Sequence, residues 1–238
     1  MIYVIGIGPG NINQMTYEAR NAIENAEVVI GYKTYIDLIL PILEGKQIYS
    51  NGMRGEVTRC KQAIELSQNG KHVAVISSGD SGVYGMAGLI YELVDYPEEV
   101  VVIPGITASI AGAALLGAPL MHDFCHISLS DLLTPFDVIM NRVKAAAQAD
   151  FVICFYNPRS HGRPNHLKAA IEIIMSIQGK DVWVGIAKDI GRENEMTHIM
   201  PISEIDYALV DMTTLVYVGN KTTFLKESKL VTPRGYHL

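Results

Sequence analysis

Cysteine is scarce in this chain of 238 residues, and its three cysteines form no CxxC pair. Cys60, Cys125 and Cys154 are odd in number and widely spaced, so neither a disulfide framework nor a zinc knuckle is expected. The HExxH and GxSxG patterns of metalloproteases and serine hydrolases are absent too. His122 and His126 lie four residues apart, but in a predicted strand this spacing gives no chelating pair. We therefore expect no protein-bound metal.

Excess positive charge and long apolar runs are also missing. The chain has 19 Lys and Arg against 25 Asp and Glu, which argues against a nucleic-acid partner. Its longest apolar segment, residues 100–121, is interrupted by prolines and glycines and is not expected to span a membrane. Residues 2–7 are apolar and follow Met1 without the basic region of a signal peptide. These absences, with 49% hydrophobic residues, predict a globular cytoplasmic protein.

Short apolar segments alternate with amphipathic segments through the first half of the chain. Strands are expected at residues 3–7, 28–31, 73–76 and 100–103, and helices at about 16–25, 34–40, 57–69 and from Tyr84 onward. Thr16 has the position of a helix N-cap, and Gly70 that of a C-terminal stop. This alternation predicts a mostly parallel α/β sheet.

In the second half of the chain, strands and helices no longer alternate regularly. Strands are expected at residues 125–129, 151–156, 182–187, 196–201 and 213–218, with helices at about 135–148 and 165–177. Helices separate only some of these strands, which predicts a mixed sheet. Because residues 113–123 are rich in Gly, Pro and small side chains, we place the boundary there. The expected organisation is an N-terminal α/β domain over 1–112, a linker over 113–123 and a C-terminal α/β domain over 124–238.

Three loops of small residues follow strands in the first half. They are Gly6-Ile-Gly8-Pro9-Gly10, Ser77-Ser-Gly-Asp-Ser-Gly-Val-Tyr-Gly85 and Pro104-Gly-Ile-Thr-Ala108. Loops between strand and helix are the usual ligand site of an open α/β sheet, and glycine lets the backbone approach a ligand closely. Together the loops predict one ligand crevice. Asp80 is expected either to bind a polar ligand or to cap the next helix, and Thr107 has the same two alternatives.

The first loop resembles a dinucleotide-binding fingerprint but lacks its third glycine. Asn11 stands at that position, and Pro9 removes one amide donor. The second strand is followed by Tyr32 and Lys33 instead of an acid. These departures argue against a nucleotide-binding oxidoreductase, the alternative from a different class. Taken alone, the loop is equally consistent with a tight turn.

Loops of the second half carry polar and basic side chains. Residues 128–135 (Ser-Leu-Ser-Asp-Leu-Leu-Thr-Pro) follow a strand and either face the crevice or cap a helix at Pro135. The segment Phe155-Tyr-Asn-Pro-Arg-Ser160 ends the next strand. Arg159 in this segment, and Arg163 after it, either pair with substrate carboxylates or are solvated surface charges. Arg192 is a further candidate for a carboxylate contact.

These loops together resemble the tetrapyrrole methylase family, and the resemblance covers nearly the whole chain, from Tyr3 to Tyr236. It is carried by the glycine-rich loop 6–10, by Ser78-Gly-Asp80 with Tyr84-Gly85, and by residues 104–108. Within the family, the chain is similar to enzymes that methylate C17 of precorrin-3B or cobalt-factor III. The segments that carry this finer resemblance are 127–135, 155–160, 191–195, 211–220 and 232–236. One departure is His161, where relatives often carry another basic residue, which leaves the local charge of the substrate wall open.

The resemblance implies two α/β domains with the cofactor cleft between them. It also implies an S-adenosyl-L-methionine-dependent methyltransferase of cobalamin biosynthesis, a homodimer, that methylates C17 of the tetrapyrrole with ring contraction. The cofactor contacts that it implies are Pro9, Gly79, Asp80, Val83, Thr107, Ala108, Asn157, Ala187 and Thr214. The candidate substrate contacts are Ser128, Arg159, Arg163 and Arg192.

Catalytic residues are harder to assign. Methyl transfer from a sulfonium depends mainly on alignment, so no strong acid–base motif is expected. Ring contraction moves protons, and the candidates for its general acid are Ser130, Asp131 and His126, although His126 is more readily explained as a structural histidine. The alternatives are family members that methylate C20 or C11, and a tetrapyrrole carrier without catalytic activity.

Overall fold

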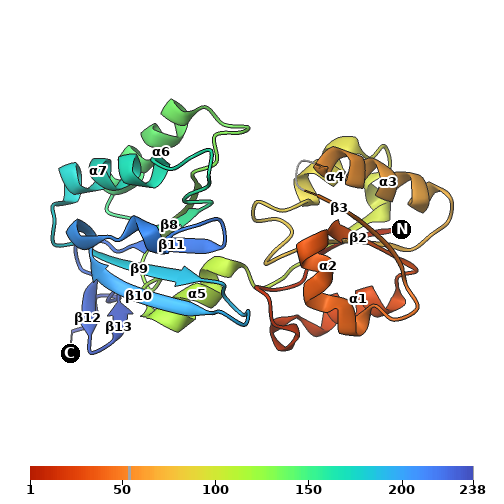
Figure 1. Cartoon of the computed structure of the whole chain (residues 1–238), viewed down its shortest axis with the longest axis horizontal. Coiled ribbons are helices and arrows are strands. Elements are labelled where there is room, and N and C mark those ends of the chain that lie inside the picture. The colour runs from red at the N-terminus through yellow and green to blue at the C-terminus, as the bar shows by residue number, and fades with distance from the viewer. Residues whose placement is uncertain (53–54, 238) are drawn as a thin grey trace. The chain divides into compact units, whose positions relative to one another are not determined.

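The computed structural model describes residues 1–52 and 55–237, and the chain divides into two compact units, Met1–Ala108 and Ser109–Leu238 (Figure 1). Each unit contains its own sheet and its own apolar core. The predicted fold class, α/β with two sheet-containing domains, is confirmed.

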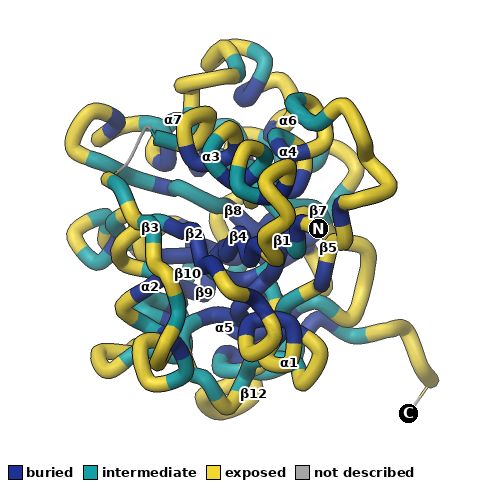
Figure 2. Tube along the Cα trace, turned by 90° about the vertical axis from the view of Figure 1, so that its right-hand side faces the viewer, coloured by how far each residue is buried: buried dark blue, intermediate teal, exposed yellow. Residues whose placement is uncertain are grey.

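Five parallel strands form the sheet of the first unit, in the order β3-β2-β4-β1-β5. The strands are β1 (Ile2–Gly6), β2 (Val28–Tyr32), β3 (Gln47–Asn51), β4 (Val73–Ser77) and β5 (Val100–Ile103). Because side chains alternate along a strand, the sheet has two apolar faces, and helices must cover both. Figure 2 shows how β1, β2 and β4 are buried.

Two pairs of helices cover these faces. The helices α1 (Tyr17–Asn25) and α2 (Lys33–Ile39) pack on the face of Ile5 and Ile76. On the opposite face, that of Val4 and Val75, lie α3 (Glu56–Gln68) and α4 (Ala87–Leu93). The side chain of Thr16 accepts a hydrogen bond from the amide of Ala19 (3.1 Å), so the predicted N-cap of α1 is confirmed.

The sheet of the second unit is mixed, as the sequence predicts, in the order β10-β9-β11-β8-β7. Its strands are β7 (Phe124–Ser128), β8 (Val152–Tyr156), β9 (Trp183–Lys188), β10 (Met196–Pro201) and β11 (Thr214–Val218). Only the pair β7 and β8 is parallel in this sheet as described. A small separate sheet joins β12 (Phe224–Lys226), β13 (Lys229–Val231) and β6 (Gly117–Ala118).

Helices cover both faces of the mixed sheet. On one face, α6 (Phe136–Gln148) and α7 (His166–Gln178) bury an apolar core with alternate residues of the strands. On the other face lies α5 (Ala108–Leu116). A β-carbon at Gly185 would lie 2.7 Å from the Leu116 side chain, so glycine at this position lets α5 pack closely on β9.

Three differences from the sequence-based expectations concern the first unit and its end. The helix expected from Tyr84 begins at Ala87, because Tyr84 has a left-handed backbone (φ 54°). The strand β3 was not predicted. The expected linker, residues 113–123, holds the end of α5 and the strand β6, and the division between the units falls earlier, after Ala108.

Short 3-10 helices connect several of these elements. They are Ile12–Gln14, Leu40–Ile42, Pro97–Glu99, Ile202–Glu204 and Tyr207–Leu209. Within the described residues, every helix is too short or too polar to cross a membrane.

Candidate functional site

The three small-residue loops of the first unit meet at the carboxyl edge of its sheet. They follow β1, β4 and β5, which are neighbours in the order β4-β1-β5 and run parallel. Gly8 and Gly79 exchange two backbone hydrogen bonds, of 3.0 and 2.7 Å, which join the first loop to the second. The loops that the sequence singled out therefore lie together in space.

Glycine is required where these loops touch. A β-carbon at Gly105 would lie 2.2 Å from the carbonyl oxygen of Gly79 and 2.6 Å from that of Gly6. Gly79 itself has a left-handed backbone (φ +69°), which favours glycine. The backbones of the three loops therefore lie in direct contact, with no side chain between them. The result is a surface of peptide groups at the sheet edge.

Asp80 joins the second loop to the third. Its Oδ1 accepts a hydrogen bond from the Gly82 amide (2.8 Å), and its Oδ2 accepts one from the Gly105 amide (2.9 Å). The expectation that Asp80 caps the next helix is wrong, because α4 begins only at Ala87 and its N-cap residue is Met86. Asp80 instead fixes the shape of the loop surface. Both of its oxygens keep lone pairs for a ligand.

Charge is nearly absent from the three loops. Across residues 6–10, 77–85 and 104–108, Asp80 is the single carboxylic acid, and there is no Lys, Arg or His. The other predicted contacts of this unit offer small or apolar side chains; they are Pro9, Gly79, Val83, Thr107 and Ala108. A ligand bound here would meet mostly backbone donors and acceptors and one negative charge.

The remaining predicted contacts lie along one edge of the second sheet. Strands β7, β8 and β9 point the same way, so their carboxyl ends share an edge with the beginning of β11. Tyr156 pairs with Ser128, and Lys188 with Thr214. Asn157 and Ala187 are the chain neighbours of Tyr156 and Lys188. Four residues that the sequence proposed from separate segments are thus brought to one edge.

Two of these four are held by local contacts. The Asn157 amide nitrogen donates to Ser128 Oγ (3.0 Å), and Asn157 has a left-handed backbone (φ 50°). Few non-glycine residues adopt this backbone conformation, and those that do cluster at functional sites. Thr214 Oγ1 donates to Asp211 Oδ1 (3.0 Å), and Lys188 Nζ lies 2.6 Å from Asp211 Oδ2. Burial alone would raise the pKa of Asp211, but hydrogen bonds from Lys188, Thr213 and Thr214 outweigh it and lower that pKa to about 2.

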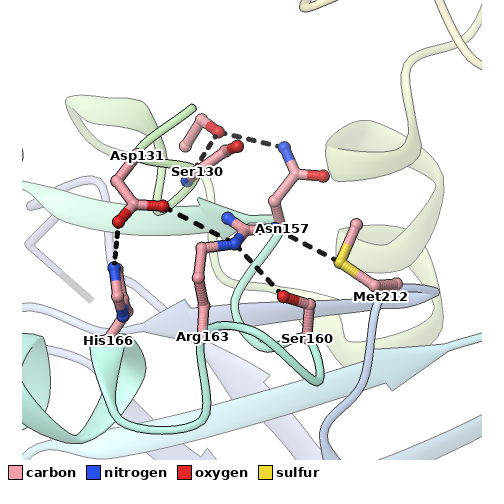
Figure 3. Close-up of polar contacts among 8 residues, drawn as sticks. Ser130, Asp131, Asn157, Ser160, Arg163, His166 and Met212 are labelled. Atoms are coloured by element: carbon pink, nitrogen blue, oxygen red, sulfur yellow. Dashed lines mark hydrogen bonds and ion pairs between the residues drawn. The ribbon is translucent and has the colours of Figure 1, made fainter. Parts of the chain in front are cut away.

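A cluster of polar side chains forms around Arg163 (Figure 3). The Arg163 Nε donates to Ser160 Oγ (3.2 Å) and lies 3.9 Å from Asp131 Oδ1. The side chain is buried, with the residue 7% exposed, and its Nη1 has no hydrogen-bond partner in the described chain. A buried guanidinium donor without a partner is costly, and an anion that reached Nη1 would supply the missing partner.

Asp131 has a second partner that the sequence did not indicate. Its Oδ2 lies 3.0 Å from Nε2 of His166, the first residue of α7 (Figure 3). The hydrogen bond from His166 lowers the pKa of Asp131, so this carboxyl is ionised at neutral pH. The alternative that Asp131 caps the following helix is wrong, since the N-cap residue of α6 is Pro135. No sequence pattern marks His166, because its partner is 35 residues away.

Other candidates lie outside this cluster. Arg159 Nη1 donates to the carbonyl oxygen of Tyr207, and Arg192 lies in a turn where its amide donates to the carbonyl oxygen of Asp189 (2.9 Å). Ser130 contacts the cluster through its amide, which donates to Ser128 Oγ (3.3 Å). His126 lies inside β7, and its Nε2 is buried without a partner in the described residues. Burial lowers the pKa of His126 and favours a neutral ring.

The sequence of the chain matches a known family over most of its length. Residues 1–206 match the model of the Tetrapyrrole (Corrin/Porphyrin) Methylases. The chain belongs to the tetrapyrrole methylase family. It is 54% identical to "Probable cobalt-factor III C(17)-methyltransferase" of Salmonella typhimurium, and the alignment covers 100% of both chains. It is therefore similar to a methyltransferase over its whole length.

A second relative and a solved structure agree with this membership. "Cobalt-factor III methyltransferase" of Priestia megaterium is 46% identical over 99% of this chain, which spans 45% of that longer protein. The crystal structure of the methyltransferase CobJ matches with a TM-score of 0.92 and 36% identity, covering 98% of this chain and 99% of that one. Its fold is thus that of the methyltransferase CobJ, and the chain is a methyltransferase.

Proposed function

We propose that this methyltransferase transfers a methyl group from S-adenosyl-L-methionine to C17 of a corrin-pathway tetrapyrrole and promotes contraction of its ring. The substrate is cobalt-factor III or precorrin-3B, and the pathway is cobalamin biosynthesis. The observation that carries the proposal is the 54% identity, over the full length of both chains, to a protein named for this reaction. The loops at the two sheet edges support it with suitable chemistry.

The residues of the first unit fit the proposed cofactor. A sulfonium amino acid carries a net positive charge at neutral pH, and its sulfonium supplies an electrophilic methyl group. The three loops hold one carboxylic acid, Asp80, and no basic residue, so they do not repel a cation. The glycine contacts leave backbone amides and carbonyls to bind the polar parts of the ligand. In the second unit, Asn157, Ala187 and Thr214 are the proposed contacts.

The substrate is a polycarboxylate, and the buried guanidinium of Arg163 suits one of its side-chain carboxylates. Arg163 Nη1 is the unpaired donor, while Ser160 and Asp131 hold the opposite side of the group. Ser128, Arg159 and Arg192 are proposed as further substrate contacts. Arg159 keeps donors beyond the one bound to Tyr207.

Ring contraction requires a group that exchanges protons with the macrocycle, and Ser130, Asp131 and His126 are the proposed candidates. Asp131 is favoured by its place beside Arg163. The lowered pKa of Asp131 and the desolvated ring of His126 weaken both as acids at neutral pH. We propose further that the protein is a cytoplasmic homodimer; sedimentation equilibrium giving twice the chain mass of 26.1 kDa is the expected result.

Calorimetric titration with S-adenosylhomocysteine, with NAD as the control, tests the class of cofactor. Binding of the homocysteine compound alone is expected, and mass spectrometry and NMR of the product then identify the methylated carbon. A product methylated at C20 or C11 would move the chain to another activity within the family. Binding of NAD alone would reopen the oxidoreductase alternative, and binding of the macrocycle without either would favour a carrier.

A further inference from the structure

His166 and Asp131 form a pair with the geometry of a positioned base. Asp131 lies in the loop after β7, and His166 is the first residue of α7, yet His166 Nε2 is 3.0 Å from Asp131 Oδ2. The ring of Phe136 packs edge-on against the imidazole, with 4.8 Å between ring centroids. A carboxylate on one nitrogen and an aromatic ring against the plane fix both the orientation and the tautomer of the imidazole.

The direction of the hydrogen bond between His166 and Asp131 is defined. Because the His166 hydrogen bond lowers the pKa of Asp131, the carboxylate is ionised and accepts the proton on Nε2. In the neutral ring, Nδ1 then carries the lone pair. Nδ1 makes no hydrogen bond within the described residues, and the His166 side chain is 17% exposed. A proton can therefore reach Nδ1 from a bound ligand.

The proposed reaction releases a proton that some group must accept. The macrocycle carbon forms its bond to the methyl group with a carbon–carbon double-bond pair, and the carbon–sulfur pair leaves with the sulfur. The positive charge of the sulfonium passes to the macrocycle, which becomes neutral again when a ring N–H loses its proton. A general base beside the substrate accelerates such a step.

We propose that His166 accepts, at Nδ1, the proton that the macrocycle loses on methylation, and that Asp131 is the positioning residue that orients His166. This inference rests on the proposed function. It assigns the proton to a residue adjacent to Arg163, the proposed receptor for a substrate carboxylate, since Arg163 and His166 share Asp131 as a partner.

The charges around the pair favour this assignment. Asp131 contacts the imidazole and also lies beside the oppositely charged Arg163, while Phe136, from α6, is neutral. Asp131 alone is a poorer base, because its lowered pKa reflects a carboxylate already stabilised by hydrogen bonds.

Full-length His166→Gln separates the proposed role from a structural one. We expect its kcat for methyl transfer to fall about 100-fold or more, the typical contribution of general base catalysis, with the substrate KM and the affinity for S-adenosylhomocysteine unchanged. The pH dependence of kcat due to this base should disappear, and imidazole should restore part of the activity of His166→Gly. The matched control is His122→Gln, an exposed histidine of the same unit, which should behave as the wild type.

A measurement without turnover tests the pair itself. In nitrogen-15 NMR of the wild type, at a pH where the ring is neutral, His166 should be protonated at Nε2, and Asp131→Asn should give a mixture of tautomers. A wild-type ring protonated at Nδ1, or a His166→Gln enzyme with normal kcat and pH profile, overturns the inference. If the wild type methylates neither macrocycle and binds no S-adenosylhomocysteine, the proposed function fails, and the inference falls with it.

Discussion

At the scale of single residues, substitution of Asp80 tests two roles: shaping the loops and, as proposed, binding the cofactor. Its carboxylate accepts hydrogen bonds from Gly82 and Gly105, and it is the one carboxylic acid in the three loops. We expect Asp80→Ala to cost about 2 kcal/mol of stability and to weaken S-adenosylhomocysteine binding beyond that loss, since hydrogen bonds to a charged group are worth roughly 1.5–3 kcal/mol. Calorimetry and thermal unfolding measure the two effects.

The control for Asp80 is Asp95→Ala, an exposed acid of the same unit. It should change neither the affinity nor the melting temperature. If Asp80→Ala loses stability but keeps its affinity, the residue shapes the loops and takes no part in binding.

Glycine-to-alanine substitutions test how closely the loop backbones pack. In Gly105→Ala, the new β-carbon would lie 2.2 Å from the carbonyl oxygen of Gly79, so we expect a loss of about 3 kcal/mol, the upper end of the usual cost of overpacking that shifts the backbone. Gly88→Ala is the matched control, because no atom lies within 4 Å of its new β-carbon in helix α4. It should be neutral or stabilising by about 0.5–1 kcal/mol. Chemical denaturation measures both, and equal stabilities would contradict the close packing.

Sequence patterns predicted the loops of the candidate site but not the side-chain contacts within it. The glycine loops, Asn157 and Thr214 follow from local residue types and a resemblance, and the structure brings them to two sheet edges. His166 could not be predicted, because its contact with Asp131 depends on how two loops fold toward each other. The unpaired nitrogen of Arg163 is likewise a property of packing that no spacing reveals.

At the scale of elements, Asp211 connects the start of β11 to the end of β9 through Lys188. The pKa of Asp211 in the folded chain, about 2, lies below its ordinary value of 3.8, so its stabilising effect is complete above pH 4 and is lost as the pH falls toward 2. The melting temperatures of the wild type and Asp211→Asn should therefore converge as the pH falls from about 4 to about 2. A constant difference, or one matched by Asp95→Asn, would contradict this account.

Hydrogen bonds of two tyrosine hydroxyls hold helix α5 against the second sheet. Tyr217 donates to the carbonyl oxygen of Ser109 (2.9 Å), and Tyr156 accepts from the Ser109 amide (3.1 Å). Tyr217→Phe leaves a buried carbonyl without this donor, and we expect a loss of about 1 kcal/mol, or roughly 2–4 °C in melting temperature. Differential scanning calorimetry measures the shift. The exposed Tyr91→Phe should show none.

The elements missed by the sequence analysis share physical causes. The strand β3 (Gln47–Asn51) is polar and lies at the edge of its sheet, where one side is unpaired and little is buried. Helix α5 reads Ala-Ser-Ile-Ala-Gly-Ala-Ala-Leu-Leu, which has no polar face to reveal a helical period. Strands and helices with clear periodicity were found within a few residues, including β2, β10, α1 and α6.

At the scale of the whole molecule, ligand binding should raise thermal stability. A ligand that binds only the folded chain adds about 2.7 kcal/mol when its concentration is 100 times the dissociation constant. For a chain of this size, S-adenosylhomocysteine at that concentration should raise the melting temperature by roughly 5–10 °C. NAD at the same concentration should not. Equal shifts with both compounds would point to a nucleotide site without selectivity for the sulfur ligand.

The strand order of the first sheet has a consequence for synthesis on the ribosome. Strand β1 emerges before both of its neighbours, β4 and β5, and the latter ends at Ile103. The nascent apolar segment Ile2–Gly6 is therefore paired on both sides only after about a hundred further residues have been synthesised. Parallel pairings of such sequence separation form slowly and expose apolar surface meanwhile. Chaperone contact early in translation, ending once β5 has left the exit tunnel, is the behaviour that this topology predicts.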